Sequence, residues 1–276
     1  GRHPVVEESL KKEVAQYISN DCFMNKNENL WLMTGPNMAG KSTFLRQVAI
    51  TILMNQIGSF VPAESARLSV FDKIFTRIGA SDNLSKGLST FMVEMIETSR
   101  IINSATESSF VILDELGRGT STEDGLAISQ AVLEYIHTQI DCTTLFATHF
   151  KELCQFSADL NRVKLKTMKI KRWKNEIIFL YEVIDGISEG SFGIHVAKLA
   201  GLKSELVERS KKILNTSPQK NKVVENKTFI DESIKSERKE NPHEDLINFL
   251  RSVELDNISP KESLDILYTL RKNYLS

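Results

Sequence analysis

Short runs of apolar residues alternate with longer stretches in which apolar residues recur at helical spacing. Residues 30–34 are almost entirely apolar and are followed at once by Gly35-Pro36, which predicts a buried strand that ends in a turn. From residue 41 to about residue 58 the apolar positions lie three and four residues apart, as on one face of a helix. The first part of the chain therefore predicts a strand, a glycine-containing turn and a helix.

The same alternation continues along the chain. Residues 110–113 form a second apolar run, which ends in Asp114-Glu115, residues 124–140 have helical spacing, and residues 143–147 form a third run. Alternating strands and helices predict a mainly parallel sheet covered by helices. Two further strands, which we expect to pair as a hairpin, are predicted at residues 163–170 and 177–183.

The amino-acid composition of the chain changes after residue 214. Residues 215–241 are dense in Lys, Glu, Asn and Ser, which predicts a flexible charged linker. Residues 242–276 carry two amphipathic segments, and residues 259–262 read Ser-Pro-Lys-Glu, the pattern of a capped helix start. A segment this short buries little core alone, so we expect it to pack on a second copy or fold back on the main domain. The predicted parts are 1–214, 215–241 and 242–276.

Composition limits the classes of function. The chain has 276 residues, of which 41% are hydrophobic, and a net charge of −1, so a protein that mainly coats the DNA backbone is not expected. The three cysteines form no Cys-x-x-Cys pair, which argues against a zinc site or a disulfide framework. No apolar run approaches the ~18 residues of a membrane helix, and no signal peptide is recognised. We expect a cytoplasmic location. The chain begins with Gly1 rather than Met, as in a piece of a longer protein or a processed chain.

The strongest chemical signal lies directly after the first predicted strand. It reads Gly-Pro-Asn-Met-Ala-Gly-Lys-Ser and fits the phosphate-binding pattern G-x-x-x-x-G-K-[ST] between a strand and a helix. Backbone N–H groups of such a loop converge on phosphates, while Lys41 adds charge at the β- and γ-phosphates and Ser42 offers a hydroxyl to Mg²⁺. The residues predicted to bind nucleotide here are Gly35, Pro36, Asn37, Met38, Ala39, Gly40, Lys41, Ser42 and Thr43.

Polar residues follow the next two predicted strands. At the carboxyl edge of the sheet, where α/β proteins bind ligands, Asp114 would hold Mg²⁺ and Glu115 would polarise the attacking water. His149 ends the neighbouring strand, within reach of a γ-phosphate. Solvated acids at a strand end and a structural histidine are the alternatives, and the adjacent phosphate loop favours the catalytic interpretation.

A helix start is predicted at residues 88–95, with Ser89 or Thr90 as the cap. One interpretation is that these residues form an ordinary capped helix. A helix N-terminus with a free hydroxyl is also an anion site, and the two interpretations are compatible.

These motifs, in this order, resemble the ATP-binding-cassette superfamily and, within it, the MutS family. The matching segments are residues 1–7, 34–43, 57–63, 75–80, 89–94, 114–122, 147–150 and 191–197. The family more often has Gly where this chain has Ala39. The tail at 242–273 is similar to the family's small C-terminal helical domain. The resemblance implies a P-loop NTPase fold of the cassette type, with a mixed, mainly parallel sheet flanked by helices, plus that helical domain.

The resemblance also implies an activity, an ATPase of DNA mismatch repair that uses ATP and Mg²⁺ in a homodimer or a larger assembly. In cassette ATPases the signature-helix serine contacts the γ-phosphate bound by the other subunit. The implied composite site combines one chain's Lys41, Ser42, Asp114, Glu115 and His149 with Ser89 of its partner.

Further roles follow from the same resemblance. Asn37 would bond near the γ-phosphate or the attacking water, and residues 117–122 would cross the dimer interface. Phe23 would stack on adenine, with a core phenylalanine as the alternative. Nothing in the chain resembles the family's N-terminal mismatch-reading domain. We therefore expect DNA contact through domains missing here, a MutL-type downstream partner, no membrane, and a bacterial, nucleoid-associated location.

Three other interpretations compete with a repair ATPase. The second bacterial MutS-like family tends to lack the Phe-Met-x-Glu of residues 91–94. Transport cassettes usually carry Leu-Ser-Gly-Gly-Gln, where residues 88–92 read Leu-Ser-Thr-Phe-Met. A nucleotide-gated dimerisation module with negligible turnover is disfavoured by the presence of Glu115 and His149.

Overall fold

The computed structural model describes residues 1–14, 16–79, 89–157, 160–173, 176–188, 190 and 192–216. The chain divides into two units, Gly1–Ser217 and Pro218–Ser276, and all of the described residues belong to the first. The helical domain predicted at 242–276 and nearly all of the linker predicted at 215–241 lie outside the described residues, so those predictions remain untested.

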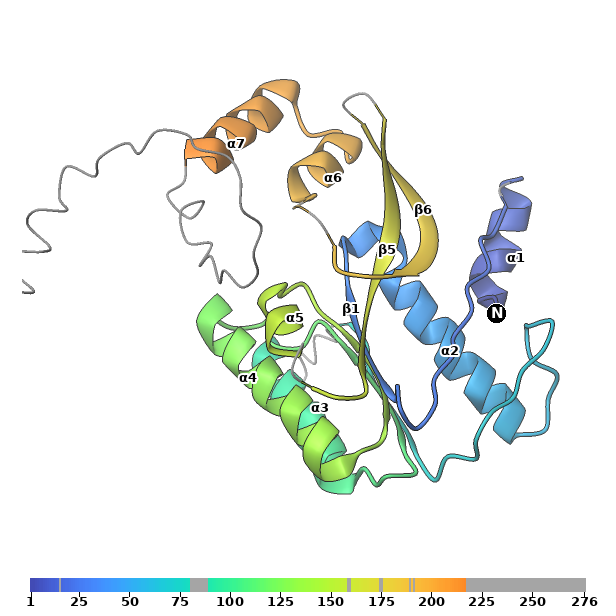
Figure 1. Ribbon diagram of the computed structural model, residues 1–276. Coiled ribbons are helices and arrows are strands. Elements are labelled where there is room, and N and C mark those ends of the chain that lie inside the picture. The colour runs from blue at the N-terminus through green and yellow to red at the C-terminus, as the bar shows by residue number, and fades with distance from the viewer. Residues whose placement is uncertain are drawn as a thin grey trace, which may run out of the picture. The chain divides into compact units, whose positions relative to one another are not determined.

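A six-stranded sheet organises the first unit (Figure 1). Its strands are β1 Leu30–Thr34, β2 Ile74–Arg77, β3 Phe110–Asp114, β4 Thr143–Ala147, β5 Val163–Trp173 and β6 Glu176–Asp185. They lie in the order β2-β3-β4-β1-β5-β6, and all neighbours are parallel except the antiparallel pair β5–β6. The mixed, mainly parallel sheet of a P-loop NTPase fold is therefore confirmed, and so is the predicted hairpin.

Helices cover both faces of this sheet, with α2 on one face and α3, α4 and α5 on the other (Figure 1). Their bounds are α1 Pro4–Lys12, α2 Lys41–Gln56, α3 Thr90–Ser104, α4 Thr122–Tyr135, α5 Glu152–Phe156, α6 Gly193–Leu199 and α7 Ser204–Thr216. A 3-10 turn, η1 Asn37–Ala39, precedes α2, and a π-helical turn, η3 Ile136–Ile140, extends α4. None of the helices in the described part of the chain is both long and apolar enough to cross a membrane.

The two cores explain the continuous apolar runs in the sequence. Successive side chains of a strand point to opposite faces of a sheet. In β1, Leu30 and Leu32 belong to the core under α3 and α4, whereas Trp31 and Met33 belong to the core under α2. A strand covered on both faces must therefore be apolar at every position.

The sequence analysis missed strand β2 and the helices α1, α5, α6 and α7. Strand β2 is only four residues long, and its positions are mostly half-buried rather than apolar throughout, so it has no run comparable with β1. Helix α1 has no buried residue and contributes no side chain to either core. The helix predicted to reach residue 58 ends at Gln56 instead, and the helix predicted over residues 124–140 begins at Thr122 and closes in the π-helical turn.

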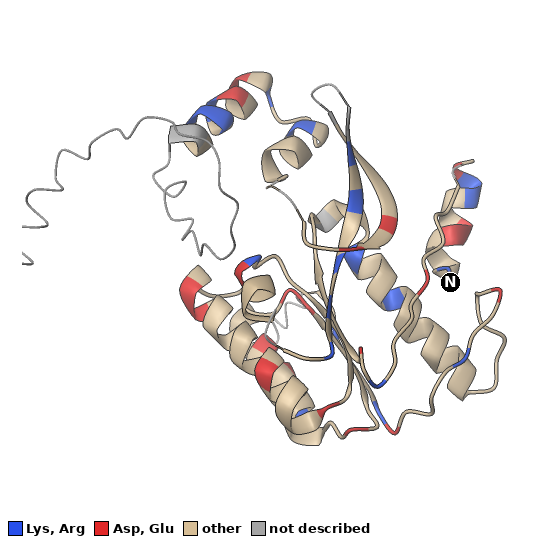
Figure 2. Cartoon of the chain, in the orientation of Figure 1, with Lys and Arg blue, Asp and Glu red and all other residues tan. Residues whose placement is uncertain are grey.

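Basic residues recur along β5 (Figure 2). Each of three lysines on that strand forms an ion pair with an acidic side chain: Lys164 with Glu28, Lys166 with Asp185 and Lys169 with Glu182. These pairs offset the positive charge of the strand, in keeping with the near-zero net charge of the chain.

The turn after β3 packs backbone to backbone on the first turn of α4. A Cβ added to Gly125 would lie 2.2 Å from the carbonyl oxygen of Gly117, and one added to Gly117 would lie 2.4 Å from that of Gly125. Gly117 also has a φ of +82°, in the left-handed region that favours glycine. Glycine is therefore required at both positions, and this contact fixes where the chain runs after the strand.

We expect Gly125→Ala to lower the free energy of unfolding by about 3 kcal/mol, the upper end of overpacking costs, because backbone cannot yield as a side chain can. Urea denaturation measures this loss. Gly193→Ala is the matched control, since a Cβ there meets nothing within 4 Å, and it should be neutral or slightly stabilising. Equal stability of the two variants would contradict the backbone contact.

Candidate active site

The loop between β1 and α2 has a backbone that glycine makes possible. Gly35 and Gly40 have φ values of +136° and +98°, which other residues rarely adopt. Ala39 is fully buried in the 3-10 turn and is not among the residues with positive φ. Its methyl group is therefore accommodated, and the departure from glycine at this position introduces no backbone strain.

Lys41 opens α2 and is only 1% exposed. Its Nζ donates to the carbonyl oxygen of Gly35, across the loop. Burial lowers the pKa of Lys41, although the carboxylates of Glu115 and Asp114 oppose the shift. Within the described residues no side chain caps the N-terminus of α2, and such a helix start favours anions. A buried ammonium beside it adds to the attraction for a phosphate.

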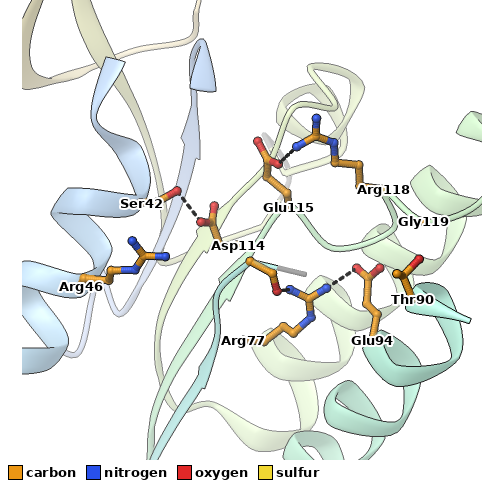
Figure 3. Close-up of a pocket in the computed structure, with 10 residues that line it drawn as sticks. Ser42, Arg46, Arg77, Thr90, Glu94, Asp114, Glu115, Arg118 and Gly119 are labelled. Carbon is orange, nitrogen blue, oxygen red and sulfur yellow. Dashed lines mark hydrogen bonds and ion pairs between the residues drawn. The ribbon is translucent and has the colours of Figure 1, made fainter. Parts of the chain in front are cut away.

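Ser42 and Asp114 form the centre of the site (Figure 3). The Ser42 hydroxyl donates to Oδ2 of Asp114 at 2.5 Å, although the two residues are 72 positions apart in the sequence. Asp114 is 5% exposed, and burial raises the pKa of its carboxyl. Its Oδ1 is buried and has no hydrogen-bond partner among the described residues.

This pair fits a magnesium ion. A hydroxyl and a carboxylate with an unused oxygen supply the oxygen ligands that Mg²⁺ prefers, and the ion usually keeps several waters. In the described part of the chain no group of three or more His, Cys, Asp or Glu side chains could hold a metal. The arrangement therefore suits an ion that arrives with a phosphate ligand better than one enclosed by protein alone.

Glu115 follows Asp114 in an unusual backbone conformation. Its φ is +57°, which costs a residue other than glycine about 1–3 kcal/mol and is found disproportionately at functional sites. Its backbone N–H donates to the carbonyl of Ala147 at 2.9 Å. Its carboxylate accepts a hydrogen bond from Arg118 at 2.5 Å (Figure 3). The strained turn and this ion pair together set the direction of the carboxylate.

His149 lies two residues beyond β4. In the sheet register Ala147, the last residue of β4, pairs with Asp114 on one side and Met33 on the other, so His149 emerges between the phosphate loop and the acidic pair. The side chain is exposed and its ring lies against that of Phe150, with centroids 4.0 Å apart. Desolvation lowers the pKa of His149, which favours a neutral imidazole at neutral pH.

A cavity of about 450 Å³ opens beside Ser42 and Asp114. It brings together three residues that the sequence singled out, namely Ser42, Asp114 and Glu115. It is also lined by three arginines, Arg46, Arg77 and Arg118, for which the sequence analysis predicted no individual role in this site. Arg46 could have been found, because it lies four residues after Ser42 on the same helix and so shares its face.

Ser89 is separate from this group. It caps α3, with its Oγ accepting the N–H of Met92 at 3.2 Å, and it is exposed. It does not line the cavity, whereas its neighbour Thr90 does.

The base-binding prediction for Phe23 stays a prediction. Its ring is 73% exposed, in the stretch that leads from Asn20 to β1. Asn20 holds β6 through its side chain, which donates to the carbonyl of Tyr181 at 2.7 Å. The Tyr181 ring lies 3.3 Å from the position of a Cβ on Gly40, and Tyr17 donates to Gln47 of α2 at 3.0 Å.

Neither Tyr181 beside the loop nor Tyr17 beside α2 could be placed from the sequence, because only long-range contacts bring them there. The prediction for Asn37 also remains open, since its side chain lies outside the described part of the structure.

Comparison with known proteins gives two family matches. A family model described as MutS domain V matches residues 31–217, and one described as the DNA mismatch repair protein MutS C-terminal region matches residues 239–273. Together they span most of the chain in the same order as the ATPase-like and tail regions distinguished by the sequence.

Individual relatives agree with this result. The chain is 47% identical over 283 aligned residues to a DNA mismatch repair protein MutS of Rickettsia bellii (strain RML369-C), covering 100% of the chain and 32% of that protein. The corresponding protein of Rickettsia canadensis is 48% identical, with 99% of the chain and 31% of the relative covered. That of Bartonella tribocorum is 44% identical, with the same coverage. The chain thus spans about a third of the length of these curated relatives.

Asp114→Asn should stabilise the chain in the absence of metal. Burial raises the pKa of Asp114, so ionisation costs the folded state more than the unfolded one. This penalty is absent below the unfolded pKa of about 3.9, grows as the pH rises from there toward the raised folded pKa, and is complete above it. We expect the variant to exceed the wild type in unfolding free energy at about pH 8 and to lose that advantage toward about pH 4.

Urea denaturation in a chelating buffer across this range measures the effect. Asp185→Asn is the control, because the hydrogen bond from Lys166 lowers the pKa of that exposed carboxyl, and its neutralisation should bring no gain at high pH. A wild type more stable than Asp114→Asn at high pH would contradict the assignment.

Proposed function

This chain belongs to the MutS family through its domain V, and we propose on that basis that it is the ATP-binding and ATP-hydrolysing motor region of a DNA mismatch-repair protein. The observation that best supports the proposal is the Ser42–Asp114 pair with its unused Oδ1, placed beside a buried lysine on a glycine-shaped loop. That combination suits a phosphate chain that carries Mg²⁺.

In the proposed reaction the loop and Lys41 bind the β- and γ-phosphates. Ser42 and Asp114 would hold Mg²⁺, which supplies positive charge to the phosphate oxygens. Glu115 orients a water and accepts its proton as the water oxygen bonds to the γ-phosphorus. The bond from that phosphorus to the bridging oxygen breaks, ADP leaves, and the proton passes to the released phosphate. His149, as a neutral imidazole, donates a hydrogen bond to a γ-phosphate oxygen.

The site is proposed to be completed by a second chain. Ser89 is exposed at the start of α3 and does not line the cavity of its own chain, which supports a role at the partner's γ-phosphate. Pairing of this kind makes a symmetric homodimer with two composite sites. The C-terminal residues 239–273, matched to the family's C-terminal region, are proposed to strengthen the dimer or build a larger assembly.

The remaining functions belong to the longer protein. We assign DNA and mismatch contact to domains outside this chain, and the ATP-dependent step to a change that engages a MutL-type repair factor. We place the protein in the bacterial cytoplasm, at the nucleoid. ATP would drive such a change only through a difference in affinity for the two states.

A nucleotide-gated module with negligible turnover is the second candidate. One contact favours it: the 2.5 Å ion pair with Arg118 occupies the carboxylate of Glu115. For hydrolysis this pair must open or share the carboxylate with water. Arg118 is 63% exposed, so little energy opposes that opening.

Two substitutions test the assignment of single residues. Lys41→Ala should weaken ATP binding by about 10- to 100-fold, the cost of a charge-assisted hydrogen bond. Glu115→Gln should keep binding while hydrolysis falls by about 10²- to 10⁴-fold, the range of general base catalysis. Fluorescent-nucleotide titration and phosphate release measure the two effects, with Glu123→Gln on the exposed face of α4 as control. Undiminished hydrolysis by Glu115→Gln would remove Glu115 from the mechanism.

Hydrolysis per chain should rise with protein concentration as dimers form.

A sharper test mixes two inactive variants, Ser89→Ala and Glu115→Gln. In a mixed dimer, the nucleotide on the Ser89→Ala chain meets an intact Glu115 in cis and an intact Ser89 in trans. Half of the dimers then have one good site of two, so about a quarter of wild-type activity should return. Failure to recover activity, with mixed dimers verified by sizing and mass analysis, would contradict a composite site.

A further inference from the structure

Glu94 is a buried carboxylate in the second turn of α3. It is 3% exposed, yet it belongs to neither the phosphate loop nor the acidic pair. Its Oε1 accepts the backbone N–H of Gly117 at 2.8 Å and lies 3.6 Å from Nη2 of Arg77 (Figure 3). One oxygen therefore joins three separate elements, which are α3, β2 and the turn that follows β3.

The turn that Glu94 holds is the one that carries the catalytic carboxylate. Gly117 is two residues after Glu115, and Arg118, the ion-pair partner of Glu115, is next. On the other side of the turn, the carbonyl of Leu116 accepts the hydroxyl of Ser129 at 2.8 Å. Leu116 and Gly117 are thus held between α3 and α4, and they follow Glu115 directly in the chain.

Close packing makes the contact with α3 tight. A Cβ added to Gly119 would lie 3.1 Å from the Cβ of Phe91 and 3.3 Å from Oε2 of Glu94. The turn therefore follows the surface of α3 closely and cannot move away from Glu94 without opening a buried contact.

We propose that Glu94 is a positioning residue for Glu115, and that it links the start of α3 to the catalytic carboxylate of the same chain. The inference rests on the proposed ATPase function. Ser89 caps the same helix that carries Glu94, so the helix that presents the predicted signature serine also carries the anchor of the turn.

Arg77 contacts the anchor from the side of β2. Its guanidinium lies 3.6 Å from Glu94 and 3.3 Å from Oε2 of Glu97, and it also donates to the carbonyl of Gly79. Glu97 is 45% exposed and contacts Arg77 without reaching the turn. It provides a matched comparison in which a carboxylate on Arg77 is lost and the hydrogen bond to Gly117 remains.

Two substitutions distinguish the effect of the length of the Glu94 side chain from the effect of its charge. Glu94→Gln removes the charge but keeps an oxygen that can accept the Gly117 N–H. Glu94→Asp keeps the charge but withdraws the carboxylate by one methylene. If the hydrogen bond positions Glu115, Glu94→Asp should lower kcat by about 10- to 100-fold, the cost of a small misplacement, with KM for ATP unchanged. Glu94→Gln and Glu97→Gln should stay within a few-fold of wild type.

The experiment measures kcat, KM, the affinity for a non-hydrolysable ATP analogue, and exchange of the Gly117 amide, all on the full chain. Faster exchange of that amide in Glu94→Asp alone, together with the selective loss of kcat, supports the inference. Loss of kcat in Glu94→Gln but not in Glu94→Asp, or a fall in kcat that only follows a fall in analogue affinity, overturns it in favour of a purely structural ion pair. A wild type that binds ATP without turnover instead overturns the proposed function, and the positioning role with it.

Discussion

The parallel pairing of β1, β3 and β4 is the constraint on which the candidate active site at the carboxyl edge of the sheet depends. Parallel strands end at the same edge of a sheet, and the register here sets Met33 and Asp114 level with Ala147. The phosphate loop, the acidic pair and His149 each leave the sheet at this edge. No one of these segments makes a site alone; their chemistry arises because the hydrogen-bonded ladder holds them in one row.

Several residues at this edge make unfavourable contributions to the stability of the fold, and the two hydrophobic cores must offset them. Burial lowers the pKa of Lys41 and raises that of Asp114, and Glu115 takes a left-handed backbone. Each of these features makes the fold less stable than it would be with neutral, unstrained residues at the same positions. A bound nucleotide with its metal would supply the missing charges, and a ligand that binds only the folded state stabilises it by mass action. Stability and occupancy of this site are therefore coupled.

Glycine has a second role beyond the phosphate loop. Gly119 lets the turn after β3 approach α3, and Gly117 and Gly125 let it approach α4. Because Gly117 touches the backbone of Gly125 on one side and the Glu94 carboxylate on the other, it is buried in the packed interior together with Leu116, whereas Arg118 and Gly119 are exposed. Packed interiors transmit displacement, which is the physical basis for linking the start of α3 to Glu115.

Local sequence was sufficient for the parts that local physics decides. The apolar runs of β1 and β4, the glycines and lysine of the phosphate loop, and the Ser89 cap are all set by neighbouring residues, and each was readable. Strand β2 was not, because a short, half-buried segment carries little periodicity. Only the tertiary structure decided that Ser42 meets Asp114 and that Glu94 holds Gly117. Those contacts join segments far apart in sequence, and a single sequence records which residues can bond but not which ones the fold brings together.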